Sequence, residues 1–81
     1  MSNGARLAEG LGNRLRELRE AKGLTQAQLA DLIGVSRKTV NTVENGVFIP
    51  STVVALKLAK ALGCSVEDLF FIVEKLLAGI E

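Results

Sequence analysis

Start and stop signals for helices recur along this 81-residue chain, and they constrain its fold more than any other feature. A serine or threonine suited to capping a helix precedes four segments, and a glycine follows three of them. The capping residues are Thr25, Ser36, Ser51 and Ser65, and the segments that follow them are 26–33, 37–44, 52–62 and one beginning at residue 66. The pattern therefore predicts short helices joined by tight turns.

A further helix is expected before these four, because apolar residues recur there at helical spacing. From Asn13 onward, Leu15 and Leu18 share one face while charged residues occupy the others, and Gly23 follows the stripe. Residues 1–11 are expected to form a flexible N-terminal arm. Five helices leave no place for a sheet, except a brief strand in the tail, so the predicted fold class is all-α.

The C-terminal tail, residues 70–81, has two interpretations. As a continued helix it would place Leu69, Val73, Leu76 and Ile80 on one face; as a strand it would present an apolar edge that needs a partner. A chain this small has little surface with which to cover such a segment. We therefore predict a dimerisation element, and the alternative is that the tail folds back on its own core. The predicted dimer contacts are Phe70, Phe71, Ile72, Val73, Leu76 and Leu77.

Composition argues against most enzymes and metal proteins. The chain has no histidine and a single cysteine, Cys64, so Ser–His and Cys–His nucleophile pairs, disulfides and zinc sites are not expected. No glycine-rich phosphate-binding motif is present. We expect no enzymatic activity and no cofactor.

Two further features bear on location and partner. No apolar run reaches the roughly 18 residues of a membrane span, and a lone thiol without an export signal fits the reducing cytoplasm. Residues 1–46 carry seven basic and five acidic side chains, whereas residues 66–81 carry one basic and four acidic. A basic face at one end of a small domain can bind a polyanion.

The stretch from Gln26 to Asn45 predicts a helix-turn-helix. Two helices of about two turns each flank Gly34-Val35-Ser36, and their inward positions are apolar: Leu29, Ile33, Val40 and Val43. In such a pair the second helix can lie in the major groove of DNA. Its outward positions hold donors and a methyl group that suit base edges, namely Arg37, Lys38, Asn41 and Thr42.

Residues 13–70 resemble the Cro/cI/XRE helix-turn-helix domain of phage repressors and small prokaryotic regulators. The matching stretches are Leu-Arg-Glu-Leu-Arg (15–19), Gly-Leu-Thr-Gln-Ala-Gln-Leu-Ala (23–30), Ile-Gly-Val-Ser-Arg-Lys-Thr-Val (33–40), Val-Glu-Asn-Gly (43–46) and Ala-Leu-Gly-Cys-Ser-Val-Glu-Asp-Leu-Phe (61–70). The resemblance implies a five-helix, lambda-repressor-like DNA-binding domain over residues 12–69. It also implies a transcriptional regulator, expected to be a repressor, that binds an inverted-repeat operator in double-stranded DNA as a homodimer.

The resemblance also assigns roles to single residues. Gln26 falls where members touch a phosphate, and Thr39 and Asn45 where they grip the DNA backbone. Base-reading positions correspond to Arg37, Lys38, Asn41 and Thr42, in the helix that Ser36 opens. Arg19 and Glu44 match a structural ion pair between the first helix and the end of the recognition helix. Members commonly have a basic residue where this chain has Val47, so one phosphate contact is expected to be missing.

A protein-interaction module, antitoxin-like or anti-repressor, is the alternative function. Leu32 and the apolar tail support it. Leu32 stands at a position that is more often charged in the family that the chain resembles. A toxin or an appended sensor domain would then be the partner.

Overall fold

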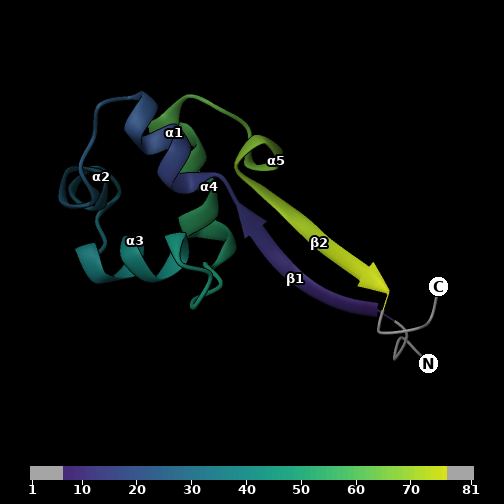
Figure 1. Ribbon diagram of the computed structural model, residues 1–81. Coiled ribbons are helices and arrows are strands. Elements are labelled where there is room, and N and C mark those ends of the chain that lie inside the picture. Colours follow the sequence, from purple (N-terminus) through teal and green to yellow (C-terminus); the bar gives the residue numbers. More distant parts are fainter. Residues whose placement is uncertain (1–6, 77–81) are drawn as a thin grey trace.

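A computed structural model describes residues 7–76 of the chain, and for residues 7–9 and 74–76 it describes the backbone alone. Seven elements follow one another, as Figure 1 shows. They are β1 (Leu7–Asn13), α1 (Leu15–Ala21), α2 (Gln26–Ile33), α3 (Arg37–Glu44), α4 (Thr52–Leu62), α5 (Val66–Leu69) and β2 (Phe70–Leu76). The helices form one body, and the two strands leave it together as a ribbon, which gives dimensions of 43 × 20 × 17 Å.

The four predicted caps are confirmed, and they set the helix boundaries. The hydroxyl of each capping serine or threonine accepts a hydrogen bond from the backbone N–H three residues later. Thr25 forms a reciprocal capping box with Gln28, and Ser65 forms one with Asp68. Gly34 and Gly63 end α2 and α4 in the left-handed conformation, which other residues adopt only with strain.

The core lies between the helices, and the inward positions predicted for the helix pair all lie in it. Leu29, Ile33, Val40 and Val43 are at most 5% exposed. The remaining buried apolar residues are Leu15, Ala30, Leu58, Ala59, Leu62, Leu69 and Phe70. Packing of this stripe, rather than helix propensity, holds such short helices in place.

The prediction of an all-α chain with a flexible arm over residues 1–11 is wrong for residues 7–11. They belong to β1, which pairs antiparallel with β2 from Leu7↔Leu76 to Asn13↔Phe70. Residues 1–6 lie outside the described part of the chain. Gly12 permits the pairing, because a Cβ there would overlap the ring of Phe71. Gly12 thus provides room for an aromatic ring in the ribbon.

The first helix starts later than predicted for the same reason. Asn13 is the last residue of β1, and its Oδ1 accepts a hydrogen bond from the backbone N–H of Leu15 at 2.9 Å. Leu11 therefore lies on the strand, where it packs against the core from outside the helix.

Of the two interpretations of the tail, the strand is correct up to Leu76. Helix α5 ends after Leu69, because Phe70 takes an extended conformation. Phe70 is 8% exposed and packs in its own core, while Phe71, Ile72 and Val73 are 38%, 61% and 44% exposed. Leu76 is described by its backbone pairing alone, and the last predicted dimer contact, Leu77, lies outside the described residues.

Candidate nucleic-acid interface

Helices α2 and α3 form the helix-turn-helix that the sequence predicts. Gly34, at φ 74°, turns the chain, and the backbone N–H of Val35 donates to the carbonyl of Ala30 at 3.0 Å. The hydroxyl of Ser36 then caps α3 by accepting from the backbone N–H of Thr39 at 3.1 Å. A satisfied three-residue turn of this kind fixes the direction in which α3 leaves α2.

The outward face of α3 carries the predicted base-reading side chains. Arg37 and Lys38 are exposed, and Asn41 and Thr42 are half-buried at the surface. The hydroxyl of Thr42 donates within reach of two carbonyls of its own helix, those of Lys38 at 2.9 Å and Thr39 at 3.1 Å. Its hydroxyl proton is therefore engaged, while its methyl group can contact a base.

The residues expected to contact the DNA backbone lie beside the outward face of α3. The hydroxyl of Thr39, a half-buried residue, lies 3.0 Å from that of Ser36, so both are engaged at the start of α3. Asn45 is exposed at the other end of the helix, where its Nδ2 donates to Oδ1 of Asn41 at 3.2 Å. Gln26, at the start of α2, is half-buried. The structure thus brings all eight predicted contact residues to α3 or its border.

The predicted ion pair joins α1 to the end of α3. Nε of Arg19 donates to Oε2 of Glu44 at 2.6 Å, and Nη2 donates to Oε1 at 3.3 Å. The third nitrogen, Nη1, donates to the carbonyl of Leu24 at 2.8 Å. The side chain of Glu44 is 0% exposed and that of Arg19 10%. This pair is therefore a buried structural tie.

The charges of the pair shift each other's pKa. The hydrogen bond to Glu44 raises the pKa of Arg19 above its ordinary value, against the opposing effect of burial. Burial by itself raises the pKa of Glu44, but hydrogen bonds from Arg19 and Gln26 outweigh it, so the pKa of this carboxyl lies below its ordinary value. Both groups are ionised at neutral pH.

Sequence reasoning missed the polar contacts around this pair. Nε2 of Gln26 donates to Oε1 of Glu44 at 3.0 Å, and Nε of Arg16 donates to the same oxygen at 3.3 Å. Nδ2 of Asn13 donates to the carbonyl of Val43 at 3.0 Å and so ties β1 to α3. Helical spacing on α1 indicates that Arg16 and Arg19 are neighbours, and this is the one signal for the Arg16 contact.

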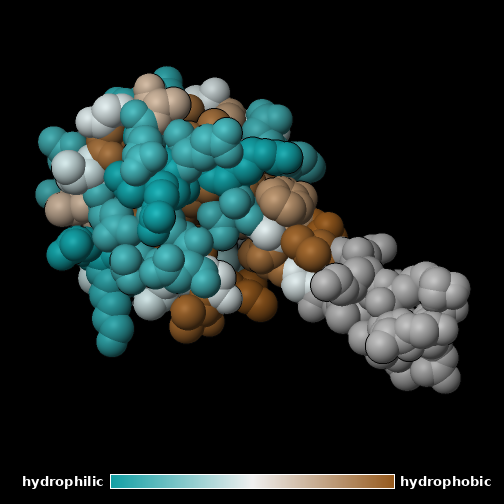
Figure 2. All heavy atoms as spheres, viewed as in Figure 1, coloured by the Kyte–Doolittle hydropathy of each residue, from teal (hydrophilic) through white to brown (hydrophobic). Residues whose placement is uncertain are grey.

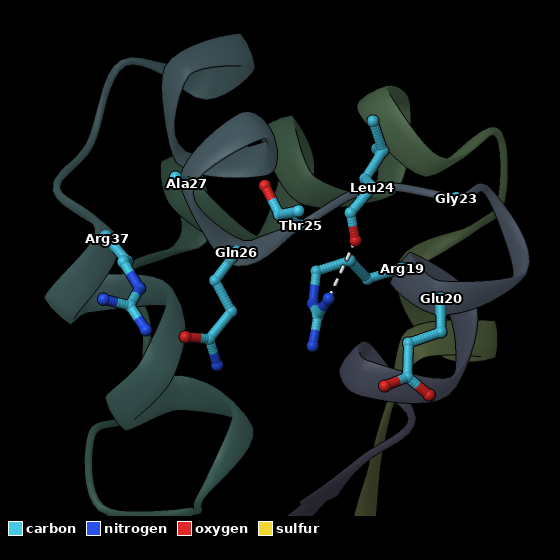
Figure 3. Close-up of a pocket in the computed structure, with 8 residues that line it drawn as sticks. All are labelled: Arg19, Glu20, Gly23, Leu24, Thr25, Gln26, Ala27 and Arg37. Carbon is cyan, nitrogen blue, oxygen red and sulfur yellow. Dashed lines mark hydrogen bonds between the residues drawn. The ribbon is translucent and has the colours of Figure 1, made fainter.

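A shallow groove runs along the start of α2 and reaches the start of α3. Arg19, Gln26 and Arg37 line it, and Figure 3 shows their polar ends pointing in the same direction. Figure 2 shows hydrophilic side chains over the region of α2 and α3, while apolar side chains gather below and where the ribbon leaves the body. The surface beside α3 is therefore polar and carries cationic groups.

Within the described residues, no group of three or more His, Cys, Asp or Glu could hold a metal ion. None of the helices in residues 7–76 has the length and apolar character needed to cross a membrane.

The sequence profile of the helix-turn-helix family matches residues 15–69 of this chain. The chain is 40% identical over 63 residues to the uncharacterised HTH-type transcriptional regulator YgzD of Bacillus subtilis, covering 78% of this chain and 96% of that protein. It is 38% identical over 66 residues to the competence pilus inhibition repressor of Acinetobacter baylyi, covering 82% of this chain and 60% of the repressor.

Among solved structures, the restriction-modification controller protein C.AhdI from Aeromonas hydrophila is similar, with a TM-score of 0.65 and 51% identity. The match covers 68% of this chain and 83% of that one. These relatives are named as a transcriptional regulator, a repressor and a controller protein. With its capped helix pair, its polar outward face and these matches, the chain belongs to the helix-turn-helix family, in the Cro/cI (XRE) branch of transcriptional regulators.

Proposed function

We propose that this chain is a sequence-specific transcriptional repressor that binds an inverted-repeat operator in double-stranded DNA as a homodimer. The observation that carries the proposal is the division of α3 into two faces. Val40 and Val43 are buried in the core, while the guanidinium of Arg37 and the ammonium of Lys38 are exposed on the other side. A helix held in this way can offer its outer face to a major groove without any rearrangement of the fold.

Contacts to base edges and to phosphates would have separate roles. Arg37 and Lys38 are suited to guanine O6 and N7, Asn41 to adenine, and the methyl group of Thr42 to thymine. Thr39 lies in the first turn of α3, and Gln26, Ser36 and Asn45 border the helix. Their hydroxyl, amide and backbone N–H groups can hold phosphates and so fix the docking. Repression is proposed because one relative is named as a repressor. Such a protein would act in the cytoplasm.

The ribbon supports the proposed homodimer. In a two-stranded ribbon each strand is paired on one side only, and an isolated ribbon is marginally stable in water. Ile72 and Val73 are exposed on its opposite faces, whereas Phe70 packs in its own core, so we do not propose it as a dimer contact. A second copy of the ribbon offers the same apolar residues and the same open edge, so it is the partner that fits.

Selection of bound sequences from a random pool of double-stranded DNA tests the proposal. An inverted repeat is expected, with half-sites about 34 Å apart, one turn of the duplex. Arg37→Ala should weaken binding to the selected site by about 1–3 kcal/mol and should relax base preference at one position of each half-site. Lys60→Ala removes the same charge from the exposed face of α4 and serves as the control. Equal binding of all sequences by the unmodified chain would refute the proposal.

The dimer has its own test. Sedimentation velocity should show a dimer that Ile72→Lys converts to a monomer, whereas Lys57→Gln on α4 should leave the dimer intact. If the chain is a monomer at every concentration, the proposed homodimer is refuted. DNA recognition by a single domain would then still be tested by the selection experiment.

A protein partner is the second candidate, and one observation favours it. Leu32 is 62% exposed beside a groove that is also lined by Ile33, Ala61 and two lysines, Lys57 and Lys60. An apolar side chain flanked by cations suits a partner with an apolar residue and carboxylates, such as a co-encoded toxin or a sensor domain. Co-purification with a protein encoded beside it, lost in Leu32→Glu, would support this function.

A further inference from the structure

A chain of hydrogen bonds connects the interior of the protein to the base-reading face of α3. Oε1 of Glu44 accepts from Nε2 of Gln26 at 3.0 Å, and Oε1 of Gln26 accepts from Nδ2 of Asn41 at 3.4 Å. Oδ1 of Asn41 in turn accepts from Nδ2 of Asn45 at 3.2 Å. Three side-chain amides thus follow one another from a carboxylate that is 0% exposed to the surface of the helix.

The carboxylate decides the direction of this chain. An ionised carboxylate can only accept, so the amide of Gln26 must turn its nitrogen inward and its oxygen outward. The outward oxygen also only accepts, so the amide of Asn41 must turn its nitrogen toward Gln26 and its oxygen toward Asn45. Reversing any one amide would place donor against donor or oxygen against oxygen.

Hydrogen bonds from its neighbours keep the carboxylate of Glu44 ionised and in place. Arg19 donates to both of its oxygens, at 2.6 Å and 3.3 Å, and Arg16 donates at 3.3 Å. Burial raises the pKa of Glu44, but the hydrogen bonds from Arg19 and Gln26 lower it by more than burial raises it. At neutral pH the group is therefore ionised and remains an acceptor. The direction of the chain is therefore fixed under the conditions in which the protein would bind DNA.

We infer that Glu44 is a positioning residue for sequence readout, because through Gln26 it fixes which way the amide of Asn41 faces a base edge. The inference rests on the proposed function. An amide has two N–H groups and two acceptor sites, so Asn41 keeps one of each for DNA. Adenine offers an acceptor, N7, beside a donor, the N6 amino group. An amide held in one direction matches that order, and a reversed amide does not.

Selection from a random duplex pool, with the full chain and single variants, tests the inference. Asn41→Ala identifies the operator position that Asn41 reads, where we expect discrimination of about 10-fold or more to be lost. Gln26→Leu interrupts the chain but keeps both bonds between Arg19 and Glu44. It should relax the same position in part, because the amide of Asn41 remains but its direction is no longer fixed. Loss of a phosphate contact by Gln26 would weaken binding to all sequences equally, so the two effects separate.

Glu44→Gln and Arg16→Gln complete the set. Glu44→Gln puts a donor where only an acceptor stood, so either direction of the chain becomes available and preference at the Asn41 position should fall. Arg16→Gln removes a hydrogen bond from the same carboxylate oxygen without changing its acceptor character, so preference at that position should remain. Circular dichroism shows whether Glu44→Gln folds. If it does not fold, the result for Gln26→Leu alone decides whether the inference holds.

The outcomes distinguish this inference from the proposed function. If the unmodified chain selects no sequence, the proposed function fails. If it selects an operator but Gln26→Leu keeps the full preference at the position of Asn41, or Asn41→Ala changes no position, the inference alone is overturned. Relaxation by Arg16→Gln equal to that by Gln26→Leu would also overturn it, because general loosening would then explain the effect.

Discussion

Replacing Arg19 by leucine would leave a charged carboxylate buried without its main partner. The side chain of Glu44 has no solvent contact, and Arg19 supplies its shortest hydrogen bond, at 2.6 Å. Gln26 and Arg16 would still donate, but at 3.0 Å and 3.3 Å and to one of the two oxygens. The variant also loses the bond from Arg19 to the carbonyl of Leu24, which fixes the turn between α1 and α2.

The expected cost follows from this burial. Removing one partner of a buried ion pair costs about 3–5 kcal/mol. A domain of this length has a free energy of unfolding of about 4–12 kcal/mol, so Arg19→Leu should be close to unfolded at the lower end of that range. The double variant Arg19→Met with Glu44→Leu buries no charge and should unfold with a free energy close to that of the unmodified chain.

Urea unfolding followed by circular dichroism, repeated between pH 7 and pH 3, measures both the cost and its cause. In the unmodified chain the pKa of Glu44 lies below its ordinary value of 4.5, so its contribution is present above pH 4.5 and is lost as the pH falls through the lowered pKa. Replacing Arg19 removes the largest cause that lowers this pKa while burial still raises it, so in the variant we expect the pKa of Glu44 to lie above its ordinary value. The variant should then gain from protonation as the pH falls, and the difference between the two proteins should shrink.

Two results would contradict this reasoning. One is a loss below about 1 kcal/mol at pH 7, which is the range of exposed ion pairs. The other is a difference that stays constant or grows as the pH falls, because a buried unpaired carboxylate must become less costly once protonated. Arg16→Leu, which removes an arginine that is 58% exposed from the same carboxylate, is the matched control and should cost less than about 1 kcal/mol.

Three further predictions concern the ribbon, the DNA surface and the thiol. Gly12→Ala should destabilise the protein by about 1–3 kcal/mol in urea unfolding because its Cβ meets the ring of Phe71, whereas Gly10→Ala, with nothing within 4 Å, should cost less; equal costs would count against the contact. Val47 follows α3 and is 78% exposed. Val47→Lys should steepen the slope of log binding constant against log salt concentration by about 0.9 if the new lysine contacts a phosphate, and an unchanged slope would show that this position lies away from DNA. Burial, with the Asp68 carboxylate adding to it, raises the pKa of the Cys64 thiol, so its alkylation by iodoacetamide at pH 7 should be slower in the folded protein than in urea; equal rates would refute this.

Helix boundaries could be predicted from the sequence wherever a cap determined them. Ser36, Ser51 and Ser65 each bond a backbone N–H three residues away, so the information lies within one turn of the chain. The apolar inward positions were equally accessible, because helical periodicity decides them. The family match over residues 15–69 covers these same segments.

The ribbon could not be predicted, because its partners are about 60 residues apart. Nothing near Gly12 indicates that an aromatic ring will lie over it, and the composition of β1 favours a loop. The polar chain from Glu44 to Asn41 escaped prediction for a related reason, since it depends on how α2 crosses α3. A pattern along one helix shows which residues face outward and does not show which of them bond to each other.

Because β1 pairs with β2, the structure of each strand depends on the presence of the other. Each strand has the other as its neighbour in the sheet, from Leu7↔Leu76 to Asn13↔Phe70. Shortening one end thus removes the partner of the other, and Asn13 carries the disturbance to the last turn of α3 through its bond to Val43. Removing either strand is therefore a change to both, and through Asn13 it reaches the helix that would read the operator.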